Sequence, residues 1–143
     1  MTTYVLDASV AAKWFLPPAR EPLSTEALRL LQDHIGGKVR FLVPDLFWPE
    51  CGNILWKGVR NRRFSRESAM DAIQDLEGLR LETAPTRPLL KQAFEIAAAD
   101  NGTVYDAAYV ALAVAASVLL VTADERLVNA LAGRYPVRWL GAL

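Results

Sequence analysis

A chain of 143 residues, 52% of them hydrophobic and 22% charged, is long enough for one domain with a full core and too short for two domains of ordinary size. Sixteen basic residues balance sixteen acidic ones, so a nucleic-acid partner must be held by a local basic patch or through metal. The single cysteine, Cys51, excludes an internal disulfide and a cysteine zinc site. We therefore expect one globular domain over residues 1–143.

The apolar segments of the chain are too short or too interrupted to predict a signal peptide or a membrane span. The start, Met1 to Tyr4, has neither a basic region nor a long apolar stretch, so the sequence predicts no secretory signal. The most apolar segment, residues 107–121, falls short of the roughly 20 residues that a membrane span needs. Together with the lone cysteine, which fits a reducing compartment, these features predict a soluble, cytoplasmic protein with no membrane partner.

The first half of the chain alternates short apolar, β-branched runs with segments of helical periodicity. In chain order we expect a strand over residues 3–6, a helix over 8–15, a helix over 23–35, a strand over 39–43 and a helix over 46–60. Pro17-Pro18 and Gly36-Gly37 end the first two helices, and Pro49 must lie in the first turn of the third, where a missing N–H costs little.

The second half continues the alternation. We expect a helix over residues 65–79, a strand over 81–83, a helix over 89–99, a turn at 100–102, a helix over 103–116, a strand over 118–121, a helix over 124–131 and a strand over 137–140. The segment 103–116 is alanine-rich with almost no polar face, which predicts burial on nearly all sides. The whole pattern predicts an α/β fold with a mainly parallel sheet of about four to five strands flanked by helices.

Four acidic residues stand where the apolar segments end or the helices begin: Asp7, Glu50, Asp106 and Asp124. The carboxyl ends of parallel strands form the crevice where chemistry is usually placed, and Asp7 and Asp124 are expected there directly. Glu50 and Asp106 would reach it from the first turns of helices, whose dipoles stabilise negative charge. Two carboxylates about 4 Å apart repel by roughly 4 kcal/mol at an effective dielectric constant of about 20, so the cluster predicts a cation between them.

Each acid taken singly also has a purely structural explanation. Asp is a favoured N-cap residue, and Asp7 and Asp124 both stand at strand-to-helix junctions. Asp106 differs because it begins a helix that the pattern predicts to be buried, and Glu50 stands among apolar neighbours. The joint placement of all four therefore favours a shared site over four unrelated caps and surface charges.

Any metal site in this chain must be built from oxygen, because there is one histidine and one cysteine. Oxygen ligands favour Mg²⁺ or Mn²⁺ over zinc, and carboxylates holding such ions are the usual apparatus for cleaving phosphodiesters. A ribonuclease mechanism with two histidines is excluded. His34 is expected at the surface near a helix C-terminus, and Cys51, which has no histidine partner, is expected to be a small buried thiol.

Three polar residues stand near the acids in the sequence: Ser9, Asn53 and Thr122. Each is placed to orient a carboxylate or a metal-bound water. A capping or core-satisfied hydroxyl is an equally good interpretation of Ser9 and Thr122. For Asn53, a partner of Glu50 and an exposed helix residue are equally good interpretations.

One cluster of basic residues follows the helix that carries Glu50: Lys57, Arg60, Arg62, Arg63 and Arg66. The default interpretation in a protein without net charge is a solvated helix end whose arginines complement the helix dipole. The alternative is that Lys57, Arg60, Arg62 and Arg63 hold phosphates of an RNA strand entering the acidic crevice.

Four stretches in a fixed order carry a family resemblance: Val5-Leu6-Asp7-Ala8-Ser9, Pro49-Glu50-Cys51-Gly52-Asn53-Ile54-Leu55, Tyr105-Asp106-Ala107-Ala108-Tyr109-Val110-Ala111-Leu112-Ala113, and Leu120-Val121-Thr122-Ala123-Asp124-Glu125-Arg126-Leu127. Through them the sequence resembles the PIN-domain ribonucleases, and among these the VapC-type toxins of bacterial toxin–antitoxin pairs, over essentially its whole length. The resemblance implies a PIN-like three-layer α/β fold.

For function, the resemblance implies a Mg²⁺- or Mn²⁺-dependent endoribonuclease, the toxin of a type II toxin–antitoxin pair. It also implies a homodimer and an antitoxin protein that blocks the site. Asp7, Glu50, Asp106 and Asp124 would be its catalytic and metal-binding carboxylates, with Ser9, Asn53 and Thr122 in support. The resemblance says little about which RNA is cut, and the basic cluster is not part of it.

Three other function classes share some of these features. A receiver-like phospho-acceptor module is also a small parallel α/β domain with acids at strand ends, but it needs a lysine at a late strand end, and the lysines here are Lys13, Lys38, Lys57 and Lys91. A phosphatase of the haloacid-dehalogenase type needs a second aspartate where Ser9 stands. A non-catalytic PIN-like interaction protein stays open, and metal-dependent cleavage of RNA distinguishes it from a nuclease.

Overall fold

The protein is described by a computed structural model that covers residues 1–143. Its centre is a five-stranded sheet in the order β3-β2-β1-β4-β5, and every neighbouring pair is parallel. The strands are β1 (Thr2–Leu6), β2 (Val39–Pro44), β3 (Glu82–Ala84), β4 (Leu119–Thr122) and β5 (Val137–Trp139). The predicted α/β class is confirmed, with five strands.

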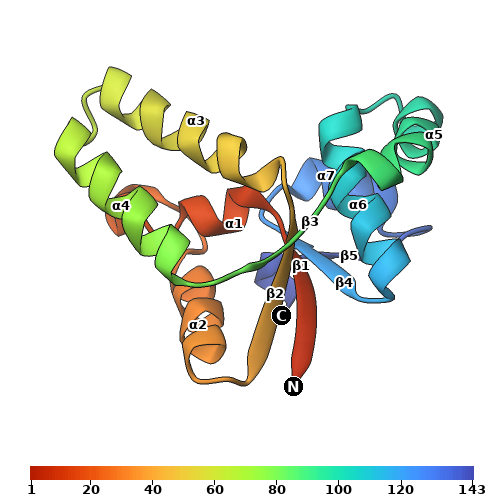
Figure 1. Cartoon of the computed structure of the whole chain (residues 1–143), viewed down its shortest axis with the longest axis horizontal. Helices are drawn as coiled ribbons and strands as arrows, with labels where there is room; N and C mark the ends of the chain where they lie inside the picture. Colours follow the sequence, from red (N-terminus) through yellow and green to blue (C-terminus); the bar gives the residue numbers. More distant parts are fainter.

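Helices cover both faces of this sheet. They are α1 (Ala8–Ala12), α2 (Ser24–Ile35), α3 (Phe47–Arg60), α4 (Arg66–Gly78), α5 (Leu90–Asp100), α6 (Val104–Ala116) and α7 (Glu125–Leu131), with single 3₁₀ turns at Pro18–Arg20, Arg87–Leu89 and Leu140–Ala142. Figure 1 shows α1 to α4 on one side of the sheet and α5 to α7 on the other. None of the helices combines the length and the apolar character that crossing a membrane requires.

The helix expected over residues 8–15 is shorter in the structure and ends at Ala12. Beyond it, the N–H groups of Trp14 and Phe15 bond to carbonyls three residues back, as in a tightening turn. Pro17 disfavours helical backbone at the residue before it, so the chain leaves the helix before the proline pair.

Strand β1 lies in the middle of the sheet and fixes where the site forms. It pairs with β2 on one edge and with β4 on the other, in a register that sets Leu6 beside Val121. Val5 and Leu6 are completely buried, and the N–H of Asp7 continues the ladder with a 3.1 Å bond to the carbonyl of Val121. Asp7 is therefore held at the carboxyl edge of the two central strands.

Helix α6 is buried against the sheet, as its alanine-rich sequence predicts. Residues 107–113 are all buried, and α6 contacts β1, β2 and β4. Thr103 caps the helix, because its hydroxyl accepts a 3.1 Å hydrogen bond from the N–H of Asp106. The cap and the packing together fix the first turn of α6, which carries Asp106.

His34 is half-buried, whereas the sequence predicts a surface position. Its ring stacks on that of Phe41 at 4.7 Å between centroids, and its two ring nitrogens lie 3.2 and 3.3 Å from the carbonyl oxygens of Val39 and Leu79. The sequence correctly places His34 near the C-terminus of a helix. The last turn of that helix, α2, packs on β2, and this packing partly buries the ring.

Candidate active site

Asp7 is the most deeply placed acid of the site. It is only 8% exposed and occupies the N-cap position of α1, but its side chain makes no capping bond. Instead, Oδ2 accepts two hydrogen bonds of 2.7 Å, from the hydroxyls of Ser9 and Thr122. Oδ1 accepts none. One carboxylate oxygen is therefore fixed by two neighbours while the other is left for a further ligand.

The two hydroxyls that hold Asp7 are themselves held. The N–H of Ala123 donates to Ser9 Oγ at 3.1 Å, and the N–H of Asp124 donates to Thr122 Oγ1 at 3.1 Å. These contacts join α1 to the end of β4. Burial raises the pKa of Asp7, the two hydroxyl bonds lower it, and the charges of Asp106 and Asp124 raise it again.

Glu50 reaches the site from the first turn of α3. Its Oε1 accepts a 2.5 Å hydrogen bond from the hydroxyl of Tyr109, which is 1% exposed on α6. Partial burial raises the pKa of Glu50, the bond from Tyr109 lowers it, and the charges of Asp7 and Asp106 raise it. Glu50 therefore lies within the electrostatic influence of Asp7 and Asp106.

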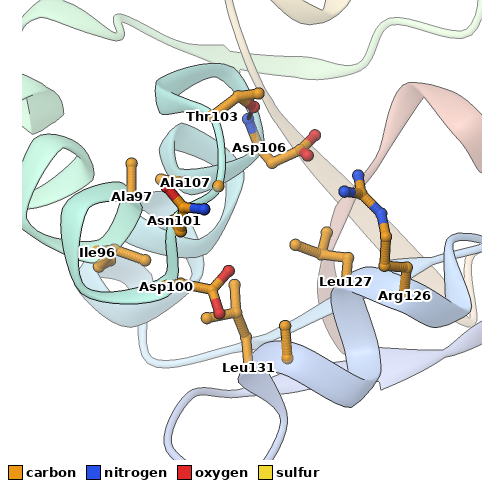
Figure 2. Close-up of a pocket in the computed structure, with 12 residues that line it drawn as sticks. Ile96, Ala97, Asp100, Asn101, Thr103, Asp106, Ala107, Arg126, Leu127 and Leu131 are labelled. Carbon is orange, nitrogen blue, oxygen red and sulfur yellow. Dashed lines mark hydrogen bonds between the residues drawn. The ribbon is translucent and has the colours of Figure 1, made fainter.

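Asp106 lies in the first turn of α6, and its carboxylate accepts no hydrogen bond. Figure 2 shows it pointing toward the guanidinium of Arg126 across an open space. Partial burial and the charge of Asp124 raise the pKa of Asp106, whereas the nearby Thr103 side chain and the charge of Arg126 lower it. Its oxygens are available to a cation or a polar ligand.

Asp124 has a capping role in addition to its place near the other acids. Its Oδ1 accepts the N–H groups of Arg126 and Leu127 at 3.0 and 3.3 Å, so it is the N-cap of α7. Its Oδ2 lies 3.8 Å from Nη2 of Arg126. The structural interpretation of Asp124 is therefore correct, and its charge still raises the pKa of Asp7 and of Asp106.

The four acids converge on one edge of the sheet without closing on a single point. No three acidic, histidine or cysteine side chains are close enough in this structure to hold one metal ion together. The donor set is nevertheless all oxygen, one oxygen of Asp7 and both of Asp106 accept no bond, and neighbouring acids raise the pKa of Asp7, Glu50 and Asp106. The chemistry of these donors fits Mg²⁺ or Mn²⁺.

Comparison with known proteins identifies the family. The model of the PIN domain matches residues 4–132 of this chain. The chain belongs to the PIN-domain family. It is also similar to a protein named Ribonuclease VapC3 from Pyrobaculum aerophilum, with 32% identity over 125 residues that cover 86% of this chain and 90% of that protein.

The fold of this PIN domain has a counterpart among solved structures. The crystal structure of PAE2754 from Pyrobaculum aerophilum superposes with a TM-score of 0.72 and 21% sequence identity, over 99% of this chain and 85% of that one. At this identity the similarity concerns the fold. It supports the assignment of the parallel sheet and its flanking helices to a PIN-like architecture.

Two further residues of the PIN domain lie apart from this network. Asn53 is exposed on α3, and its side chain makes no hydrogen bond to Glu50. Cys51 is buried, as predicted, and burial followed by the charges of Glu50 and Asp7 raises its thiol pKa to about 12. The thiol is therefore protonated at neutral pH and is not a nucleophile.

The basic cluster lies at the far end of α3. Arg60 is about 15 Å along the helix axis from Glu50, at about 1.5 Å rise per residue. Lys57, Arg60 and Arg62 are exposed. Arg63 is 4.0 Å from Oε1 of Glu21, whose Oε2 forms a 3.1 Å ion pair with the buried Lys13. Contact between this cluster and RNA stays a prediction. Such contact would involve a part of the RNA strand that lies away from the acids.

Sequence reasoning missed two residues of the site, Tyr109 and Arg126. Tyr109 stands three positions after Asp106 in a helix predicted to be buried, and a buried tyrosine hydroxyl requires a partner, which was the available signal. Arg126 stands two positions after Asp124, so the N-cap geometry turns it back toward the acids. No periodicity reveals that placement.

Proposed function

We propose that this PIN-domain protein is a metal-dependent endoribonuclease that acts as the toxin of a type II toxin–antitoxin pair. The observation that carries the proposal is Asp7, a buried carboxylate with one oxygen fixed by Ser9 and Thr122 and one left free. Membership of the family and similarity to a protein named as a ribonuclease support RNA as the substrate.

Mg²⁺ or Mn²⁺ would be held by Asp7 and Asp106, whose oxygens are the least engaged, together with Glu50 and Asp124. When bound, the ion supplies a Lewis acid and a water of lowered pKa. Since no three of these groups share one point in the structure, binding requires the side chains to move together. A bound cation would offset the repulsion among these carboxylates.

The remaining side chains orient the carboxylates and exchange protons. Ser9 and Thr122 hold Asp7 in one rotamer, so its free oxygen keeps a fixed direction. Tyr109 does the same for Glu50. Partial burial raises the pKa of Glu50, so its carboxylate is a stronger proton acceptor than an exposed glutamate.

RNA cleavage by pure protein tests the nuclease and separates it from a non-catalytic interaction protein. We expect cleavage of a labelled single-stranded RNA with Mg²⁺ or Mn²⁺ and none in excess chelator. Asp7→Asn and Asp106→Asn should each abolish cleavage, whereas Asp75→Asn, which changes an exposed acid on α4, should not. Cleavage that persists in chelator or in both active-site variants would exclude the mechanism.

The toxin role implies two partners, a second copy of this chain and an antitoxin. We propose a homodimer and an antitoxin whose tail lies across the acidic edge and offers an arginine or lysine to it, because unpaired carboxylates attract a guanidinium as they attract a metal ion. The test is a structure of the complex formed with the product of an adjacent small reading frame. Full inhibition by an antitoxin that stays away from Glu50 and Asp106 would contradict this placement.

A further inference from the structure

A cavity of about 160 Å³ opens directly beside Asp106, between α5, α6 and α7. Its floor is apolar and includes Ile96, Leu127 and Leu131, while Asp100, Asp106 and Arg126 supply charge at its walls and mouth. Figure 2 shows these residues around an open centre. The acidic site is therefore continuous, through Asp106, with a pocket whose other lining residues have no part in holding the metal.

The size and lining of the cavity fit one flat, partly apolar group. Pockets of about 300–1,000 Å³ take drug-sized molecules, so this cavity fits a fragment of such a molecule. An RNA strand whose phosphate lies at the acids offers a neighbouring base of this kind. Sequence-specific recognition of single-stranded RNA works by turning bases out of the stack into such pockets and bonding their Watson–Crick edges.

Asp100 gives the pocket its chemical preference. It is the last residue of α5, is half-buried at the cavity wall, and its carboxylate takes part in no hydrogen bond or ion pair. A carboxylate offers two acceptors and no donor. Guanine is the base with two adjacent donors, N1–H and N2–H₂, on its Watson–Crick edge. Adenine and cytosine pair one donor with an acceptor, and uracil flanks its single donor with two acceptors.

Arg126 supplies the link between this base pocket and the reacting phosphate. Its side chain is 82% exposed, and its guanidinium faces Asp106 across the mouth of the cavity. A guanidinium in this position presents several donors to a phosphate, frequently in bidentate fashion. The acids come first, then Arg126, then the cavity. A metal ion, the scissile phosphate and the neighbouring base would lie in the same order.

We infer that this cavity is a guanine subsite, in which Asp100 accepts the N1–H and N2–H₂ groups of a base next to the scissile phosphate and Arg126 contacts the phosphate. The inference rests on the proposed ribonuclease function and adds to it the base that the site selects. Asp100 is a specificity-determining residue and has no part in the chemical step.

The test uses labelled uracil oligonucleotides that carry one central guanine, adenine, cytosine or inosine. We expect wild-type protein with Mn²⁺ to cleave beside guanine about tenfold faster than beside adenine or cytosine, the size of effect that a bidentate pair gives. Inosine, which lacks the N2 amino group, should fall between guanine and adenine. Asp100→Asn should shift the preference to adenine or cytosine, because an amide offers one donor and one acceptor.

Two controls separate this inference from the nuclease proposal. Glu95→Gln changes the exposed carboxylate of α5, which lies outside the cavity lining, and should leave the guanine preference intact. Fluorescence anisotropy with the Asp7→Asn variant measures binding of the same oligonucleotides without cleavage and should show the same guanine preference. Equal cleavage of all four oligonucleotides, or a guanine preference kept by Asp100→Asn, overturns the subsite. Guanine-selective binding that disappears in the Asp7→Asn, Asp100→Asn double variant, with no cleavage by wild type, supports the subsite and refutes the nuclease.

Discussion

The hydroxyl of Tyr109 donates a 2.5 Å hydrogen bond to Oε1 of Glu50, which joins the buried face of α6 to the first turn of α3. Burial, followed by the charge of Asp7 and the contact with Glu50, raises the pKa of this phenol, so it stays a donor throughout the working pH range. Tyr109 is a positioning residue because it acts on the reaction through Glu50.

Tyr109→Phe should shift the pH dependence of cleavage. The hydrogen bond lowers the pKa of Glu50, so its loss raises that pKa and moves the acidic limb of the pH–rate profile to higher pH. The ring still fills its place, and Glu50 keeps access to water, so stability should fall by only about 1 kcal/mol. The measurement is a pH–rate profile with a urea unfolding curve. Profiles that superpose would show that Tyr109 serves packing alone.

Metal-free protein should gain stability from the active-site acids as the pH falls. The pKa values of Asp7, Glu50 and Asp106 are raised in the folded state, while unfolded carboxyl groups titrate near about 4. Between these limits the folded state binds more protons, so the contribution of these groups to the free energy of unfolding rises as pH falls toward about 4 and is lost as pH rises through the folded pKa values.

Asp106→Asn isolates this effect. The side chain of Asp106 accepts no hydrogen bond, so the amide removes one repelling charge at little structural cost. The variant should melt at a higher temperature than wild type in chelator at neutral pH and show a smaller rise on addition of Mn²⁺, since a ligand stabilises according to its affinity. A variant that is less stable in chelator, with an undiminished Mn²⁺ shift, would place Asp106 outside any metal site.

Lys13→Met should destabilise the fold through the acid that it leaves behind. Lys13 is 7% exposed, its Nζ lies 3.1 Å from Oε2 of Glu21, and the second neighbour of Glu21 is Arg63 at 4.0 Å. Removing one partner of a buried pair costs about 3 kcal/mol or more, and methionine retains the packing of the lysine stem. Urea unfolding measures the loss. The exposed Lys91→Met is the control, and an equal effect of both changes would show that the pair adds nothing.

Two glycines of α3 should respond oppositely to alanine. Alanine normally favours a helix interior over glycine by about 1 kcal/mol. At Gly52 no atom lies within 4 Å of the added Cβ, so Gly52→Ala should stabilise the protein. At Gly58 the Cβ would lie 2.2 Å from the Phe64 ring, so Gly58→Ala should destabilise it by about 1–3 kcal/mol through overpacking. Unfolding curves that rank both variants above wild type would mean that Phe64 moves aside freely.

The sequence predicts the order of strands and helices because the spacing of hydrophobic residues and the positions of proline and glycine are local signals. The segment 103–116 is an example, since its alanine-rich pattern already predicts the buried α6. The prediction was weakest where tertiary contacts decide. The proline pair ended α1 three residues early, and packing on β2 turned His34 inward. Neither event has a periodic signature.

The positions of the four acids in the fold followed from strand ends and helix starts, but their individual engagements did not. The sequence leaves open that Asp7 is bonded by two hydroxyls from distant segments, that Asp124 caps α7, or that Asn53 stays exposed. These outcomes depend on side-chain direction after the sheet has formed. For the same reason, the spacing of residues in the sequence does not predict the placement of Arg126 or the cavity beside Asp100.

The central position of β1 has a consequence for the birth of the protein on the ribosome. Asp7 is made almost first, yet its strand pairs with β4, and the Thr122 hydroxyl that holds it comes from the last fifth of the chain. A growing polypeptide therefore lacks the hydroxyl of Thr122 that holds Asp7 until β4 has been made. Under the proposed ribonuclease function, the site is therefore incomplete while the first four-fifths of the chain are being made.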